Sequence, residues 1–213
     1  MTRLSLLLVG HVDPRSTHIA GDYPQLYQTL LAPLGIDVVP YDWADGQTPS
    51  NVDECDAWLC SPSRMSTYEP APWLADVEQF LRTLIATEWP YIGICFGHQL
   101  LAQALGGRVA KAEAGWGVGV QPYMLLEQPA WACPAPSVVR LIASHQDQVV
   151  DMPVGARRWL TFRATAATPE CSSANGHGPS RRTPSSCLPW LIICMRGGSN
   201  CWAPMLLLRP APR

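Results

Sequence analysis

The chain of 213 residues is 47% hydrophobic, has 15% charged residues and carries a net charge of −2 at neutral pH. This length favours one well-buried domain over two. The near-neutral balance argues against the strongly basic surface of a nucleic-acid-binding protein. We therefore expect small-molecule or protein partners and no nucleic acid.

The first apolar run, Leu4–Val9, follows one positive charge and is shorter than a signal-peptide core, so it predicts a buried strand. No segment approaches the roughly 20 apolar residues that span a bilayer. The eight cysteines form no C-x-x-C pair, and no cysteine and histidine cluster has zinc-site spacing. We expect a soluble, cytoplasmic protein with reduced thiols, no metal, no cofactor and no membrane partner.

Short apolar runs alternate with segments of helical period, a pattern typical of an α/β domain in which helices cover both faces of a mostly parallel sheet. Residues 115–125 and 137–150 predict strands and loops of less regular period. The expected strands are Leu4–Val9, Val38–Tyr41, Ala57–Cys60 and Tyr91–Ile94, and the expected helices are Tyr23–Leu34, Pro72–Thr87 and Gly97–Leu105.

The segment Gly93–Gly97 has the form G-x-nucleophile-x-G, in which two glycines let a strand turn abruptly into a helix. A cysteine is more often a buried small residue than a nucleophile, but this setting favours Cys95 as a nucleophile. At a helix N-terminus the unpaired N–H groups and the helix dipole are expected to stabilise its thiolate. The backbone N–H of Phe96 is expected to stabilise an oxyanion.

The longer string Tyr91–Gly107 resembles the nucleophile motif of class I glutamine amidotransferases. The resemblance implies a flavodoxin-like, three-layer αβα fold with a cysteine nucleophile elbow. It also implies that Cys95 attacks the side-chain amide of L-glutamine, releases ammonia and leaves a γ-glutamyl thioester for water to hydrolyse. Gln99 matches a family position that helps to hold the substrate, whereas His98 has no family role as a base and is expected to pack locally.

Two further strings, Gly21–Pro24 and Ser144–Val149, resemble a subgroup similar to the glutaminase half of GMP synthase. The second string matches an S-H-x-D-x-V loop that lines the glutamine pocket in that subgroup. The resemblance therefore implies that His145 and Gln146 contact the substrate. An isolated histidine in a loop is also common as a purely structural residue.

The loop Ser61–Glu69 resembles the family loop that supplies the second oxyanion-hole N–H. Family members usually have glycine about where this chain has Pro62, and proline has no N–H to donate. We therefore expect Ser63 to be the donor, or the oxyanion hole to be impaired.

The catalytic histidine and glutamate of the family come from a late G-H-P-E-F-like string, which is absent here. No acidic residue follows Glu170, and the composition changes abruptly. Codons for Pro179–Ser186 can read A-F-Q-A-H-P-E-F in an adjacent frame. We therefore predict a frameshift between Arg158 and Pro169, a glutaminase-like domain at 1–168 and an aberrant, poorly ordered tail at 169–213.

The first functional hypothesis is a glutamine amidotransferase-like domain whose activity is lost or reduced, since His177, Glu170 and His11 have no setting that suits a base. Its partner would be a separate synthase subunit that accepts ammonia, because the chain has no P-loop or S-G-G-x-D-S string. A related cysteine hydrolase of γ-glutamyl amides or peptides is the second hypothesis. A non-catalytic binding module or pseudogene product is the third. We also expect the apolar stretches 188–195 and 205–208 to be poorly accommodated.

Overall fold

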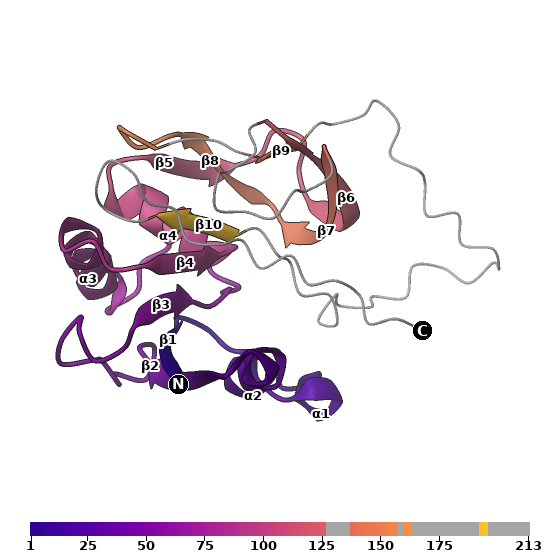
Figure 1. Ribbon diagram of the computed structural model, residues 1–213. Coiled ribbons are helices and arrows are strands. Elements are labelled where there is room, and N and C mark those ends of the chain that lie inside the picture. The colour runs from indigo at the N-terminus through magenta and orange to yellow at the C-terminus, as the bar shows by residue number, and fades with distance from the viewer. Residues whose placement is uncertain (127–136, 157–159, 163–191, 196–213) are drawn as a thin grey trace.

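The computed structural model describes residues 1–126, 137–156, 160–162 and 192–195. Its central sheet has the strand order β10-β4-β3-β1-β2, and Figure 1 shows the helices packed around it. Strands β1 to β4 pair in parallel, whereas β10 pairs antiparallel with β4. The strands are β1 (Thr2–Leu8), β2 (Ile36–Asp42), β3 (Ala57–Cys60), β4 (Tyr91–Ile94) and β10 (Ile192–Met195).

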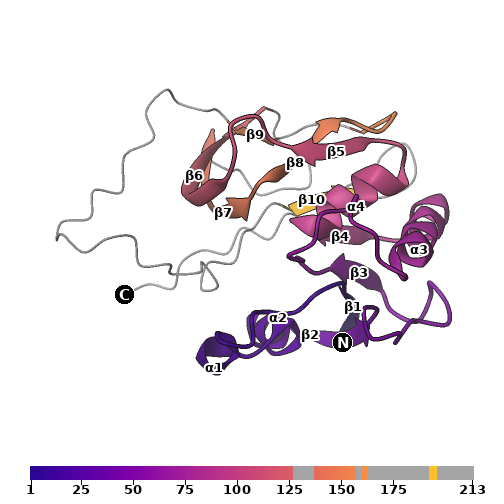
Figure 2. The same ribbon diagram turned by 180° about the vertical axis from the view of Figure 1, so that it is seen from behind.

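One face of this sheet is covered by helices α3 (Leu74–Ala86) and α4 (Phe96–Ala104) (Figure 2). The strands present Leu7, Trp58 and Tyr91 to these helices, and all three side chains are fully buried. Burial of a large apolar side chain stabilises the fold by about 1.5–3 kcal/mol. This layer therefore supports the segment that runs from β4 into α4.

The opposite face is covered by α2 (Tyr23–Leu31), which follows the short helix α1 (Thr17–Ala20). Leu6, Leu59 and Ile94 pack on this side. Successive residues of β1 serve different helical layers, because side chains alternate along a strand. The predicted αβα arrangement with a mostly parallel sheet is confirmed.

The predicted helix at Tyr23–Leu34 begins where expected and changes character near its end. Asp22 caps it, and its carboxylate accepts the first backbone N–H of the helix at 2.8 Å. The last turn tightens into the 3₁₀ helix η1 (Ala32–Leu34), since Pro33 has no N–H to continue the α-helical ladder. Gly35 then ends the helix with φ 71°.

Beyond the β10 edge of the central sheet lie two smaller antiparallel sheets (Figure 1). One pairs β5 with β8, and the other has the order β7-β6-β9. The sequence predicted irregular strands here but missed β5, which is short and has a charged residue at each end. These strands are β5 (Arg108–Lys111), β6 (Gly117–Leu125), β7 (Val138–His145), β8 (Asp147–Asp151) and β9 (Leu160–Phe162).

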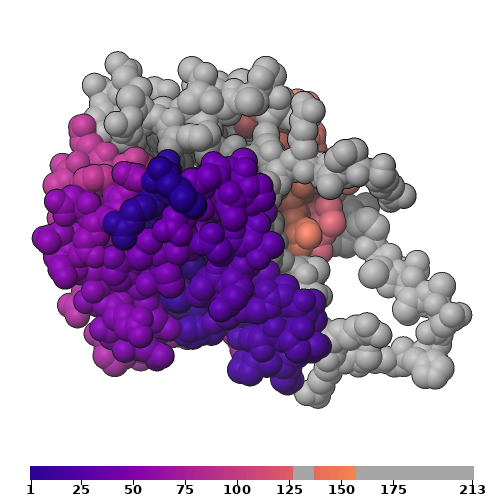
Figure 3. All heavy atoms as spheres, turned by 60° about the horizontal axis from the view of Figure 1, so that its bottom comes forward, coloured from indigo at the N-terminus to yellow at the C-terminus, as the bar shows by residue number. Residues whose placement is uncertain are grey.

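The expectation for the apolar stretch 188–195 is wrong at Ile192–Met195, which forms β10 and completes an edge of the central sheet. The backbone groups of β4 gain partners from this pairing. The rest of the segment 169–213 lies outside the described residues, and so does the predicted frameshift region from residue 163 on. In the space-filling view the N-terminal residues, indigo to purple, form one continuous body (Figure 3). None of the helices in the described ranges has the length and apolar character that crossing a bilayer requires.

Candidate active site at the Cys95 turn

The chain turns sharply at Cys95, between the end of β4 and the start of α4. The backbone of Cys95 has φ 51° and ψ −103°, a region that residues with a Cβ atom rarely occupy. Glu88 is the only other non-glycine residue with positive φ in the described ranges. Such a conformation costs about 1–3 kcal/mol and persists only where the surroundings enforce it. The predicted strand-to-helix turn is therefore present and strained.

Close backbone packing explains both glycines of the turn. A Cβ atom on Gly93 would lie 2.5 Å from the carbonyl carbon of Gly97 and from the nitrogen of His98. A Cβ atom on Gly97 would lie 2.8 Å from the Cβ and the carbonyl oxygen of Cys60 in β3. The Tyr91 hydroxyl donates a hydrogen bond of 2.9 Å to the Gly97 carbonyl. The first turn of α4 is thus held directly against β3 and β4.

The thiol of Cys95 is held in its neutral form. Its pKa is raised to about 11, chiefly by burial, while the Phe96 backbone N–H acts in the opposite direction and the charge of Asp147 raises the pKa as well. The expectation that the helix N-terminus leaves a stabilised thiolate is therefore wrong. The Phe96 N–H does favour the anion, but the loss of hydration outweighs it.

Within the described ranges no histidine forms a hydrogen bond or ion pair with Cys95. His98 is buried, which lowers its pKa to about 4, and its Nδ1 has no partner. Burial also lowers the pKa of His145, whose Nδ1 is likewise without a partner. Both rings are neutral near pH 7, and the burial of His98 fits its expected packing role. The weaker candidates His177 and Glu170 lie outside the described residues.

His11, at the end of β1, is engaged by two carboxylates. Its Nδ1 lies 2.6 Å from Asp22 Oδ2 and its Nε2 lies 3.1 Å from Asp42 Oδ2, and the hydrogen bond with Asp22 raises the pKa of the ring. Neither nitrogen is left to accept a proton from Cys95. One ligand atom each of His11, Asp42 and Asp45 lie within 4.8 Å of one another, so these groups are also a candidate metal-ligand set. The ion pairs satisfy the ring without a metal.

The loop after β3 is fastened to the end of β1. The Val9 N–H donates to Ser61 Oγ at 3.1 Å. An added Cβ on Gly10 would lie 2.8 Å from Ser63 Oγ, so the two segments are in close contact. Pro62 is buried and has no N–H, which leaves Ser63 as the nearest following donor. Because carboxyl ends of parallel strands meet at one edge of a sheet, this loop and the elbow share that edge.

The turn between β7 and β8 meets the elbow helix. Gln99 Nε2 donates to the Asp147 carbonyl at 2.8 Å, and the Tyr68 hydroxyl donates to Asp147 Oδ1 at 2.9 Å. The Gln146 carbonyl accepts the Ala112 N–H at 2.9 Å, which ties the turn to the segment after β5. The structure therefore brings the predicted substrate residues to the elbow. Sequence reasoning assigned no role to Tyr68 or Asp147, and the S-H-x-D-x-V string was the only signal for Asp147.

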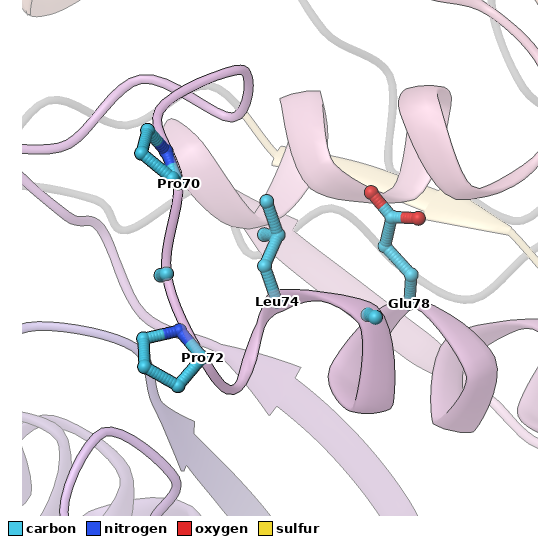
Figure 4. A pocket seen from close by; sticks show the side chains of 6 residues that line it. Pro70, Pro72, Leu74 and Glu78 are labelled. Atoms are coloured by element: carbon cyan, nitrogen blue, oxygen red, sulfur yellow. The ribbon is translucent and has the colours of Figure 1, made fainter.

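A separate open groove of about 510 Å³ lies at the start of α3. Figure 4 shows Leu74 and Glu78 pointing the same way from the first turns of that helix. Cys95 does not line this groove, so it is distinct from the elbow. The lining residues are Pro70, Ala71, Pro72, Leu74, Ala75 and Glu78.

Comparison with known proteins gives curated relatives of two kinds. Gamma-glutamyl peptidase 4 of Arabidopsis thaliana is 26% identical over 144 residues, which cover 64% of this chain and 57% of that protein. A subunit of the glutamine-hydrolyzing GMP synthase of Halobacterium salinarum is 30% identical over 152 residues, which cover 71% of this chain and 73% of that protein. The chain spans only 48–60% of the length of three Arabidopsis gamma-glutamyl peptidases that it matches.

Solved structures and a family model agree on the fold. A glutamine amidotransferase from Thermotoga maritima superposes with a TM-score of 0.65 at 21% identity, covering 76% of this chain and 68% of that one. The family model described as glutamine amidotransferase class-I matches residues 25–168, a span that includes the strained turn and the β7–β8 turn. The chain therefore belongs to the class-I glutamine amidotransferase family.

Proposed function

We propose that Cys95 is the nucleophile of a hydrolytic reaction on a γ-glutamyl amide, with L-glutamine as the substrate. The observation that carries this proposal is the φ of 51° at Cys95, enforced by close packing at Gly93 and Gly97. The sulfur attacks the amide carbonyl carbon and forms a tetrahedral oxyanion. Its collapse breaks the C–N bond, and ammonia leaves with the thiol proton. Water then hydrolyses the thioester to glutamate and regenerates the thiol.

The oxyanion is assigned to two backbone N–H groups, those of Phe96 and Ser63. The Phe96 N–H already acts on the Cys95 sulfur, since it lowers the thiol pKa. The Ser63 N–H comes from the loop that is packed against Gly10, at the same edge of the sheet. We assign substrate contacts to Gln99, His145 and Gln146, which supports a glutamine pocket between α4 and the β7–β8 turn.

We further propose that turnover in this chain is lost or strongly reduced. A pKa of about 11 leaves little thiolate at neutral pH, and the described residues supply no histidine that bonds the sulfur. The family model stops matching at residue 168, which supports a frameshift between Arg158 and Pro169 as the cause. The nucleotide sequence tests this directly, because the codons for 179–186 must encode H-P-E-F in another frame.

A second substrate class is supported by the relatives. Several of them are named gamma-glutamyl peptidases, so a γ-glutamyl peptide is the alternative substrate of the same elbow. Other relatives are named as subunits of glutamine-hydrolyzing GMP synthase, which supports glutamine as substrate and a separate synthase partner that accepts the ammonia. The elbow chemistry is the same in both cases, and only the leaving amine differs.

The test is covalent trapping of Cys95 beside measured turnover. A glutamine-derived chloroketone is added to the full chain and to Cys95→Ala, and the adduct is located by mass spectrometry. Ammonia release from glutamine and amine release from a γ-glutamyl dipeptide are followed in parallel. Adduct formation at Cys95 with turnover at or near background supports the proposal, and the preferred substrate is the one that competes with the adduct. Absence of any adduct at Cys95 rejects a working nucleophile and favours a non-catalytic binding module.

A further inference from the structure

The helix that carries the nucleophile also holds two loops through a pair of glutamines. Gln99 and Gln103 are four residues apart on α4, so their side chains leave the helix on the same side. Gln103 Nε2 donates to the Thr67 carbonyl at 2.9 Å and to Glu78 Oε1 at 2.8 Å. Gln99 Nε2 donates to the Asp147 carbonyl at 2.8 Å. One glutamine therefore fastens the 61–69 loop, and the other fastens the β7–β8 turn.

A third contact closes these two into a ring. Tyr68, next to Thr67 in the loop, donates its hydroxyl to Asp147 Oδ1 at 2.9 Å. Asp147 thus accepts from α4 through its backbone and from the loop through its side chain. Helix, loop and turn are each bonded to the other two. Such a closed arrangement fixes three segments relative to one another, whereas an open chain of contacts lets the end members move.

Two observations distinguish this ring from ordinary surface packing. The Asp147 side chain belongs to a residue that is only 9% exposed, and its negative charge disfavours the nearby Cys95 thiolate. A buried carboxylate that opposes the nucleophile's ionisation is costly unless its hydrogen bonds serve another end. Tyr68 is 46% exposed, yet its hydroxyl is turned to Asp147 and not to water. Both features point to the geometry of the loop.

We propose that Tyr68, Asp147 and Gln103 are positioning residues that set the 61–69 loop, with its Ser63 N–H, against the Cys95 elbow. This inference rests on the proposed function, because it concerns the oxyanion formed during attack by Cys95. Oxyanion stabilisation depends on donors that are already in place when the charge develops. A displacement of about 1 Å is enough to cost about 100-fold in rate. The ring supplies that placement from outside the reacting atoms.

The test compares two reactions of Cys95 in the full-length chain. Acylation by γ-glutamyl p-nitroanilide passes through an oxyanion: the C–S bond forms, the C–N bond breaks and p-nitroaniline leaves with the proton. Alkylation by iodoacetamide displaces iodide at a saturated carbon and forms no oxyanion. Tyr68→Phe is expected to slow acylation by about tenfold or more, in line with partial loss of an oxyanion donor, and to change alkylation by no more than about twofold.

Matched variants separate positioning from stability. Tyr41→Phe removes another hydroxyl bonded to a carboxylate, that of Glu54, far from the elbow, and should leave both reactions unchanged. Asp147→Asn keeps an acceptor for Tyr68 and should retain acylation, whereas Asp147→Ala should lose it to the same extent as Tyr68→Phe. Equal acylation in Tyr68→Phe and wild type overturns the inference. A parallel fall of acylation and alkylation also overturns it.

Amide hydrogen exchange decides the inference independently of acylation. Tyr68→Phe should speed exchange in the 61–69 loop, and Tyr41→Phe should not. If the wild type is alkylated by iodoacetamide but never acylated, the proposed function fails, while exchange in the loop still reports on the ring. Unchanged exchange in Tyr68→Phe overturns the inference in that case.

Discussion

Replacing Gly93 by alanine is the sharpest test of the strained turn. The new Cβ would lie 2.5 Å from two backbone atoms, the carbonyl carbon of Gly97 and the nitrogen of His98. Carbon contacts are most favourable near 3.5–4.0 Å, so the overlap is about 1 Å. The opposing atoms belong to the first turn of α4 and move only if the elbow opens. We expect a loss of about 3 kcal/mol, at the upper end for overpacking.

Urea unfolding of the full chain measures this loss. With a slope of about 2 kcal/mol per molar urea, the midpoint of Gly93→Ala should fall by about 1.5 M. Gly117→Ala is the matched control, because its Cβ would meet nothing closer than 3.7 Å. That variant should stay within about 1 kcal/mol of wild type, since alanine also reduces the entropy of the unfolded chain. Equal midpoints for the two variants would refute the packing argument at the elbow.

Three predictions concern titration. Iodoacetamide labelling of Cys95 should rise about tenfold per pH unit up to the thiol pKa of about 11, and a plateau below pH 8 would contradict it; Asp147→Asn should move this profile to lower pH, because it removes a charge that raises the pKa. The raised pKa of His11 means that its stabilising contribution is full below the unfolded-state value of 6.5 and is lost as pH rises through the folded-state value, so His11→Asn should flatten the fall in urea midpoint on the alkaline side. His98 has the opposite sign: its pKa of about 4 means that stability is full above pH 6.5 and is lost as pH falls toward 4, so His98→Gln should lose less stability than wild type between pH 7 and pH 5.

The nucleophile turn was predictable because its signals are local. The strand at Tyr91–Ile94, the glycines at 93 and 97 and the helix that follows are adjacent in sequence. Their steric requirements are satisfied within a few residues. The alternating apolar runs likewise predicted four parallel strands, because a strand buried on both faces needs a short continuous apolar run. Only element ends shifted, as at the 3₁₀ turn before Gly35.

The antiparallel strands near the elbow were harder to predict. Strand β5 is only four residues long, Arg108–Lys111, and its partner β8 begins at Asp147. Pairing between segments this far apart depends on where the intervening chain places them. β10 is a second case, since Ile192–Met195 is an apolar run whose partner, β4, lies about 100 residues earlier. Nothing local in either segment identifies its neighbour.

The sequence by itself determined the elbow, the sheet type and the family resemblance around Cys95. Only the tertiary structure decided the state of the thiol, because burial, a property of the whole fold, outweighs the helix N-terminus and raises the pKa to about 11. Tertiary structure also decided that Tyr68 and Asp147, which are 79 residues apart, share a hydrogen bond beside the elbow. Local steric rules act over a few residues, whereas desolvation and loop contacts depend on segments that only folding brings together.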